Sequence, residues 1–191
     1  SELVFSTYCW LESASLEPVV SDSIISLFKL LKEGKVDEII LPFENSVEGS
    51  VNTSIDLIIK SEGFFIRREI LLLIEHALMM HKGSDKNHLK TLYSHPQALA
   101  QCSDWLSNNL PNSLQLPTSS TAEAVKMVQG SRFRAAIASR SSKTDQSLKE
   151  IAFPINDIAV NRTRFVLLQH EKPIQKGSKS SFAFSLHSNA P

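Results

Sequence analysis

Two adjacent residues late in the chain, Thr163 and Arg164, have the side chains best suited to chemistry. An arginine stays charged at every physiological pH and binds a carboxylate through two parallel hydrogen bonds. The threonine hydroxyl beside it can donate a hydrogen bond, or a proton, to an oxygen atom held nearby. We expect both side chains to face a common crevice and, together with the polar segment 42–52, to form a site for a small anionic substrate that loses a hydroxyl group.

The composition excludes several classes of partner. The chain has 191 residues, 42% of them hydrophobic, so it can bury the core of one domain or of two small lobes. Twenty basic residues balance twenty acidic ones, and this zero net charge provides no surface for nucleic acid or for an anionic membrane. The longest apolar stretch, residues 70–74, is too short to cross a bilayer, and no secretory signal is visible. We therefore expect a cytoplasmic protein without a nucleic-acid or membrane partner.

Neither the cysteines nor the histidines indicate a metal site. Cys9 and Cys102 lie far apart in the sequence and form no CxxC motif, so both are expected to be reduced. The six histidines are scattered, without the spacing that is typical of zinc ligands. We therefore expect no bound metal.

Short apolar stretches alternate with amphipathic ones, a pattern typical of a parallel α/β protein. The polar residues of 42–50 predict a turn, and the apolar residues of 64–81 predict two strands or one long bent strand. The remaining pattern predicts helices over 24–31, 51–61, 96–106 and 121–128, and strands over 38–41, 89–93, 114–116, 135–138, 165–168 and 181–186.

Three of the predicted helices begin with polar residues directly after a strand. At the ends of strands in an open α/β sheet, free backbone N–H groups and the helix dipole favour the binding of anions. Serine, threonine and asparagine also cap helices in many proteins, so capping stays an alternative at each of these positions. The residues are Ser50 with Asn52, Ser94 with Pro96 and Gln97, and Ser119 with Ser120 and Thr121.

Other polar residues allow both a functional and a structural interpretation. Gln97 and Gln101 lie four residues apart, so on a helix their amides share one face, which lines a cleft or faces solvent. Glu44 lies in the predicted turn, where it does not form a catalytic carboxylate pair but could orient a threonine, an asparagine or an arginine. His95 could act as a base or as a structural hydrogen-bonding residue.

Four segments are specific enough to indicate a family. In the same order along the chain, they closely resemble the catalytic domain of prephenate dehydratase, and the resemblance runs from about residue 16 to residue 168. The segments are PFENSVEGSVNTSIDL at 42–57, YSHPQALAQC at 93–102, STAEA at 120–124 and NRTRF at 161–165.

This resemblance implies an α/β fold with two lobes, similar to type II periplasmic binding proteins, with the active site in the cleft between the lobes. Lobe 1 would comprise residues 1–72 and 152–172, and lobe 2 would comprise residues 73–151. Residues 173–191 would form a linker and the start of a truncated ACT domain.

The activity implied by the resemblance is that of a hydro-lyase in phenylalanine biosynthesis. Such an enzyme converts prephenate to phenylpyruvate with loss of water and carbon dioxide, without a cofactor, and a homodimer or homotetramer is implied for the full-length protein.

In that family the threonine of the Thr-Arg-Phe block is the principal catalytic residue, a role that falls on Thr163 here. We hypothesise that Arg164 holds the pyruvyl carboxylate of the substrate, because a cation on the ring carboxylate would oppose its loss. The implied catalytic residues are Thr163, Arg164, Asn45 and Gln101, and the implied substrate-binding residues are Glu44, Ser46, Ser94, His95, Gln97, Ser120, Thr121, Glu123 and Phe165.

The chain departs from the family pattern at both ends. Apart from Phe5 and Ser6, nothing matches the Gly-rich turn that follows the family's first strand, and most of the phenylalanine-sensing ACT domain is missing. We therefore expect a chain that is cut at both ends and begins inside the first helix. Two alternatives stay open. One is arogenate dehydratase, whose substrate has an amino group where prephenate has a keto oxygen, and the other is a catalytically inactive two-lobed module that binds small anions.

Overall fold

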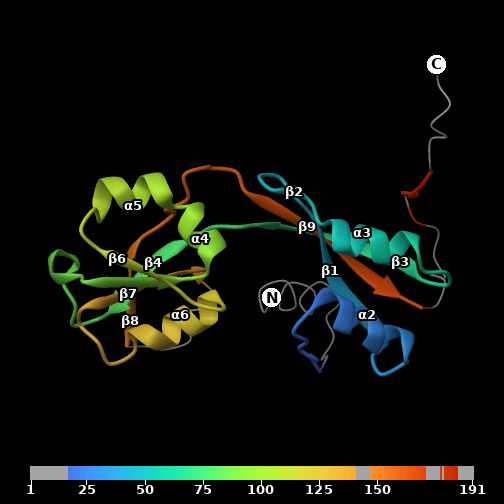
Figure 1. The fold of residues 1–191 in the computed structure, drawn as a ribbon, viewed down its shortest axis with the longest axis horizontal. Helices are drawn as coiled ribbons and strands as arrows, with labels where there is room; N and C mark the ends of the chain where they lie inside the picture. The colour runs from blue at the N-terminus through green and yellow to red at the C-terminus, as the bar shows by residue number, and fades with distance from the viewer. Residues whose placement is uncertain (1–16, 141–146, 171–176, 178, 185–191) are drawn as a thin grey trace, which may run out of the picture. The chain divides into compact units, whose positions relative to one another are not determined.

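The computed structural model describes residues 17–140, 147–170, 177 and 179–184. The chain divides into two compact units: the first unit comprises residues 1–72 and 162–191, and the second unit comprises residues 73–161. Figure 1 shows that each unit has its own sheet with helices beside it. The expected α/β class with two lobes is therefore confirmed.

The first unit is built on a four-stranded sheet in the order β2-β1-β9-β3, whose one face is covered by helices. Phe28 and Leu31 of helix α2 are buried in one apolar cluster with alternate residues of β1 and β9, which are Ile39, Leu41, Val166 and Leu168. The elements are α2 (Ile24–Lys32), β1 (Glu38–Asn45), β2 (Gly49–Ser50), α3 (Asn52–Ile59), β3 (Phe65–Leu73) and β9 (Arg162–Gln169).

Antiparallel pairing of β1 with β9 aligns segments that are far apart in the sequence. Near one end of this pair, Glu44 lies opposite Arg164 and Asn45 lies opposite Thr163, after a β-bulge at Phe43. Because the ladder continues to Asn45, the chain turns only after this residue, and the turn predicted over 42–50 is too long. For the same reason β9 begins before Thr163 rather than at residue 165.

The second unit is built on a five-stranded sheet in the order β6-β5-β7-β4-β8. Strand β5 pairs parallel with β6 and β7, whereas β4 pairs antiparallel with β7 and β8. The parallel arrangement predicted for the whole chain is therefore confirmed only for β6, β5 and β7. The elements are β4 (Ala77–His81), the 3-10 helix η1 (Lys86–His88), β5 (Thr91–Ser94), α4 (Pro96–Ala100), α5 (Ser103–Asn109), β6 (Leu114–Pro117), α6 (Thr121–Val128), β7 (Arg134–Ala138) and β8 (Leu148–Ala152).

Helices cover both faces of this second sheet. Leu78 and Met80 of β4 are buried with residues of α4 and α5, whereas Ala77 and Met79 are buried with residues of α6. A strand that is buried on both faces has a continuous apolar sequence, because successive side chains alternate between the faces. Strand β4 therefore contains no polar residue before His81.

The helix predicted over 96–106 is broken into α4 and α5. Gln101 is the C-cap of α4, and the next residue, Cys102, is the N-cap of α5. The carboxylate of Asp157 accepts hydrogen bonds from the backbone N–H groups of Asp104 and Trp105 at 3.0 and 2.9 Å. A carboxylate at these N–H groups stabilises a new helix start, which explains the break.

The chain leaves the second unit later than the sequence predicted. Residues 152–161, which we assigned to lobe 1, belong to the second unit. The backbone N–H of Ile155 donates to the carbonyl of His76 at 3.0 Å, and that of Asp157 donates to the carbonyl of Gln101 at 2.9 Å. These hydrogen bonds, with the burial of Ile155 in the apolar core, attach the segment to the second unit.

Several expectations concern residues outside the described ranges. They are the start of the chain with Cys9, and most of the segment 173–191. Residues 181–184 are described and lie in neither a strand nor a helix, so this part of the strand predicted over 181–186 is wrong. Within the described ranges, no helix has the length and apolar character needed to span a membrane.

Candidate functional site

The structure brings Asn45 and Thr163 into direct contact. The amide Nδ2 of Asn45 donates a hydrogen bond to Thr163 Oγ1 at 2.8 Å, across the last pair of the β1–β9 ladder. Asn45 is 8% exposed and Thr163 is half-buried. Two residues that the sequence separates by most of its length thus form one polar pair.

The other end of the Asn45 amide determines the direction of this hydrogen bond. Asn45 Oδ1 accepts from the backbone N–H groups of Val47 at 2.8 Å and Glu48 at 3.0 Å. A backbone N–H can only donate, so Oδ1 must face the turn and Nδ2 must face Thr163. The Thr163 oxygen is therefore an acceptor toward Asn45, and its proton stays available for another oxygen atom. In the part of the chain that the structure describes, no residue accepts this proton.

The turn after Asn45 holds the pair in place from both strands. The backbone N–H of Ser46 donates to the carbonyl of Arg162, and the Ser46 hydroxyl oxygen accepts from the Arg162 N–H, both at 2.9 Å. Gly49 then has a φ of +85°, which residues with a side chain rarely adopt, and it pairs back with Asn45. Ser46, predicted to bind substrate, thus joins the start of β9 to the end of β1.

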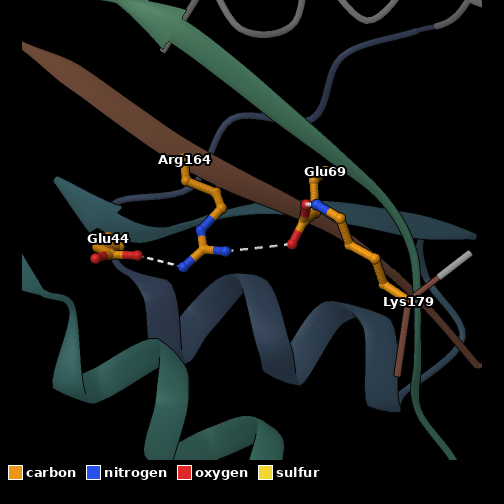
Figure 2. A network of polar contacts seen from close by, with 4 residues as sticks. All are labelled: Glu44, Glu69, Arg164 and Lys179. Atoms are coloured by element: carbon orange, nitrogen blue, oxygen red, sulfur yellow. Dashed lines mark hydrogen bonds and ion pairs between the residues drawn. The ribbon is translucent and has the colours of Figure 1, made fainter. Parts of the chain in front are cut away.

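Arg164 lies between two carboxylates from the neighbouring strands. Figure 2 shows its guanidinium between Glu44 of β1 and Glu69 of β3, with Lys179 on the far side of Glu69. The Arg164 Nη1–Glu69 Oε1 distance is 3.4 Å, and the guanidinium also lies 5.3 Å from the centre of the Phe43 ring. The hydrogen bond from Lys179, and then the charges of Lys179 and Arg164, hold the pKa of Glu69 below its usual range.

Thr163 and Arg164 do not face one common crevice, which corrects our central expectation for this pair. Successive residues of a strand point to opposite faces of the sheet. Arg164 lies two and four positions before Val166 and Leu168, so its side chain is on the same face of the sheet as theirs. This is the face that the helices cover, and Arg164 lies there beside Glu44. Thr163 points to the opposite face with Asn45. Phe165, another predicted substrate-binding residue, lies two positions after Thr163 and therefore on the same face of the sheet, and it is 9% exposed.

Gln101 is fixed in the second unit by a histidine that the sequence did not single out. The Gln101 Oε1 atom lies 2.9 Å from Nε2 of His76, which is 7% exposed. Burial lowers the pKa of His76, and the hydrogen bond with Gln101 only partly opposes this effect. A neutral imidazole therefore holds one of the four predicted catalytic residues.

The predicted residues at the start of α4 have structural contacts. Ser94 is completely buried and donates its hydroxyl proton to the carbonyl of Ile137 at 2.7 Å, so this proton is not available to a ligand. His95 is the N-cap of α4, and its Nδ1 accepts from the backbone N–H of Gln97 at 3.3 Å. Gln97 itself is exposed on the first turn. The capping alternative thus describes His95, while the role of Gln97 in binding stays a prediction.

The predicted residues at the start of α6 form a helix cap. Ser120 is the N-cap, and its Oγ accepts from the backbone N–H of Glu123 at 3.1 Å. The Glu123 carboxylate accepts from the N–H and the hydroxyl of Ser119 at 2.8 and 2.6 Å, and these hydrogen bonds lower its pKa. Thr121 is the first residue of the helix. By contrast, the N-cap of α3 is Val51, which makes no side-chain cap hydrogen bond, so neither Ser50 nor Asn52 caps that helix.

We expect Ser120→Ala to lower the free energy of unfolding by about 1 kcal/mol, because it removes the oxygen that accepts the Glu123 N–H. Ser120→Asn is the matched control, since asparagine caps helices as well as serine does. Urea denaturation followed by circular dichroism measures the difference. Equal stabilities of the two variants would contradict the capping role.

The described residues contain no group of three or more His, Cys, Asp or Glu side chains that could hold a metal ion. Cys102, the one cysteine among them, is buried, and burial followed by the charge of Asp157 raises its pKa to about 12. Such a thiol is protonated at neutral pH and is a poor nucleophile or metal ligand.

The structure therefore groups the predicted site residues by unit. Asn45, Ser46 and Thr163 lie together at the end of the β1–β9 ladder, and Glu44 with Arg164 lies on the other face of the same ladder. Phe165 belongs to the same ladder, opposite Pro42. The remaining predicted residues, Ser94, His95, Gln97, Gln101, Ser120, Thr121 and Glu123, lie in the second unit. The expected cleft between the lobes stays a prediction.

Comparisons with known proteins find relatives along most of the chain. The family model described as prephenate dehydratase matches residues 1–173. The bifunctional chorismate mutase/prephenate dehydratase of Neisseria gonorrhoeae is 36% identical over 171 residues, which are 88% of this chain and 47% of that protein. The prephenate dehydratase of Lactococcus lactis subsp. lactis is 36% identical over 176 residues, 89% of this chain and 62% of that protein.

A solved structure is similar as well. The prephenate dehydratase of Arthrobacter aurescens in complex with L-Phe superimposes with a TM-score of 0.73 at 28% identity, over 84% of this chain and 54% of that one. The chain thus spans 47% to 62% of the length of these relatives.

Proposed function

Since the chain belongs to the prephenate dehydratase family, we propose that it converts prephenate to phenylpyruvate in phenylalanine biosynthesis, with loss of water and carbon dioxide. The observation that carries the proposal is the hydrogen bond from Asn45 to Thr163, which leaves the threonine proton available to a substrate oxygen.

The chemistry of prephenate suits a single well-placed donor. The bond between the ring and its carboxylate breaks as carbon dioxide is released, and its electron pair enters the ring. The ring carbon–oxygen bond then breaks as hydroxide leaves, and the hydroxide becomes water by taking a proton from the solvent. The ring becomes aromatic, so the driving force is internal, and the main barrier is the poor leaving group. A donor aimed at the departing oxygen lowers this barrier, an effect worth on the order of 10²- to 10⁴-fold in rate.

Thr163 is the proposed donor. A threonine hydroxyl is a weak acid, so we infer that it stabilises the departing oxygen by a hydrogen bond rather than by complete protonation beforehand. The hydrogen bond that Thr163 accepts from Asn45 supports this role, because accepting one hydrogen bond strengthens the bond that the same hydroxyl donates. Amide donors such as that of Gln101 would assist at other substrate oxygens.

Arg164 has a different role in the proposal from the one we hypothesised from the sequence. Its two carboxylate partners and its position on the helix-covered face support a positioning role, in which it joins β1, β9 and β3 at the end that carries Thr163. We expect Arg164→Lys to leave the KM for prephenate near the wild-type value and to lower the free energy of unfolding by less than about 1 kcal/mol. Steady-state kinetics and urea denaturation measure these quantities, with Glu44→Gln as a matched variant. A large rise in KM for Arg164→Lys alone would restore the view that Arg164 binds a substrate carboxylate.

The proposed activity is tested by mixing the purified protein with prephenate at neutral pH and following the absorbance of phenylpyruvate. Arogenate is assayed in parallel, because it differs only in the amino group. Turnover of arogenate alone would replace the proposed substrate. Binding of prephenate in a calorimeter without any product would favour the inactive anion-binding module.

The proposal also includes a cytoplasmic location and a homodimer or homotetramer for the full-length protein. The buried and reduced thiol of Cys102 agrees with a reducing compartment. Cell fractionation tests the location, and light scattering after gel filtration tests the oligomeric state.

A further inference from the structure

His76 is a buried imidazole that no step of the proposed reaction uses. It lies between β3 and β4, is 7% exposed, and has one hydrogen-bond partner for its ring among the described residues, the Gln101 Oε1 atom at 2.9 Å from Nε2. Its other ring nitrogen, Nδ1, is buried without a partner in the part of the chain that the structure describes. A buried and half-satisfied histidine beside a predicted catalytic glutamine calls for a physical explanation.

The unpaired nitrogen identifies the tautomer. Burial lowers the pKa of His76, so the ring is neutral and carries one N–H group. With the proton on Nδ1, a donor would be buried without an acceptor, and such orphaned N–H groups are rare in proteins. With the proton on Nε2, the donor meets Gln101 Oε1, and only a lone pair is left without a partner. The Nε2–H tautomer is therefore the favoured one.

This tautomer determines which end of the Gln101 amide faces His76. A glutamine amide has an oxygen that accepts and a nitrogen that donates two hydrogen bonds. Because Oε1 is bound to the imidazole, the NH₂ end points away from the ring. Gln101 would thus present N–H donors, rather than an acceptor, to an anionic substrate.

The backbone around both residues is fixed as well. The carbonyl of Gln101 accepts from the N–H of Asp157 at 2.9 Å, and Asp157 also caps helix α5. The N–H of His76 donates to Oδ1 of Asn156 at 2.7 Å, and Nδ2 of Asn156 donates to the carbonyl of Ile74 at 3.1 Å. The imidazole and the amide are therefore held against each other from two segments of the second unit.

We propose that His76 is a positioning residue, which binds the oxygen of the Gln101 amide through Nε2–H and so directs the amide N–H groups of Gln101 toward the substrate. This inference rests on the proposed dehydratase function, because Gln101 is expected to act on the substrate of that reaction. Donors held by buried neighbours need no reorganisation when charge develops in the transition state.

Two variants of similar size separate positioning from simple burial. His76→Phe keeps a planar aromatic ring but removes the donor, and we expect it to lower kcat by about 10- to 100-fold, because a misdirected catalytic group can cost this much. His76→Gln places an amide nitrogen near the position of Nε2 and is expected to recover most of the lost kcat. The KM for prephenate should change little in both variants, since the N–H groups act mainly in the transition state. Thermal denaturation of both variants verifies that they are folded.

A spectroscopic measurement tests the same proposal without activity. Long-range ¹H–¹⁵N correlation spectra of the wild-type protein, with His76→Phe to assign the signal, report which ring nitrogen carries the proton. We expect Nε2–H at neutral pH, and an Nδ1–H tautomer would overturn the proposal. Equal kcat values for His76→Phe and the wild type, or a failure of His76→Gln to exceed His76→Phe, would overturn it too. If the wild type does not turn over prephenate, the proposed function fails, while the spectra still decide whether His76 orients Gln101.

Discussion

Thr163→Val is expected to lower kcat for prephenate by on the order of 10²- to 10⁴-fold while KM stays near the wild-type value. Valine keeps the volume and the β-branched shape of threonine but can neither donate to the departing oxygen nor accept from Asn45. The hydroxyl acts where the carbon–oxygen bond breaks, so its loss affects the transition state more than the binding of the substrate.

Thr163→Ser is the matched control for this prediction, because serine keeps the hydroxyl and can accept from Asn45 in the same geometry. Steady-state rates of phenylpyruvate formation, measured over a range of prephenate concentrations, give kcat and KM for each variant. A Thr163→Val protein that keeps the wild-type kcat would rule out Thr163 as the donor. A Thr163→Ser protein as slow as Thr163→Val would indicate that the methyl group matters more than the hydroxyl.

The Thr163–Arg164 pair illustrates what the sequence could and could not predict about the site. The site that the residue types predicted near this pair stays a prediction, whereas the expected association of the pair with the segment that contains Asn45 is confirmed by the hydrogen bond from Asn45 to Thr163. The expectation that both side chains face one crevice was wrong because the strand was predicted to begin at residue 165, after the pair. Pairing with β1 extends β9 back to Arg162, so Thr163 and Arg164 both lie within the strand. Because successive side chains of a strand point to opposite faces of the sheet, the two side chains lie on opposite faces.

Contacts between distant segments account for the other differences. The break between α4 and α5 depends on Asp157, a residue more than 50 positions away that has no local signal for helix capping. His76 was not recognised because it lies with Glu75 between two apolar runs without a motif around it, and only the fold brings it to Gln101. The apolar runs themselves were informative, since the strands β4 and β7 follow from them directly.

The role of Asn45, which donates a hydrogen bond to Thr163, can be tested by replacing this donor with an acceptor. Asn45→Asp is expected to lower kcat by on the order of 10²- to 10⁴-fold, about as much as Thr163→Val. One oxygen of the introduced carboxylate can still accept from the N–H groups of Val47 and Glu48, so the turn is kept. The other oxygen replaces the amide nitrogen that lies 2.8 Å from Thr163 Oγ1, and an ionised carboxylate can only accept. The Thr163 proton would then turn toward this carboxylate and be lost to the substrate.

Asn45→Ala distinguishes capture of the proton from loss of an amide. This variant also removes the donor to Thr163, but it leaves no acceptor in its place, so the hydroxyl proton stays available. We therefore expect Asn45→Ala to keep more activity than Asn45→Asp, even though alanine also removes the oxygen that binds Val47 and Glu48. The double variant Asn45→Asp/Thr163→Val should be no slower than either single variant, because both remove the same donated proton and effects within one such unit are not additive. If Asn45→Ala were slower than Asn45→Asp, or if the two losses multiplied in the double variant, Asn45 would act on the substrate directly and not through Thr163.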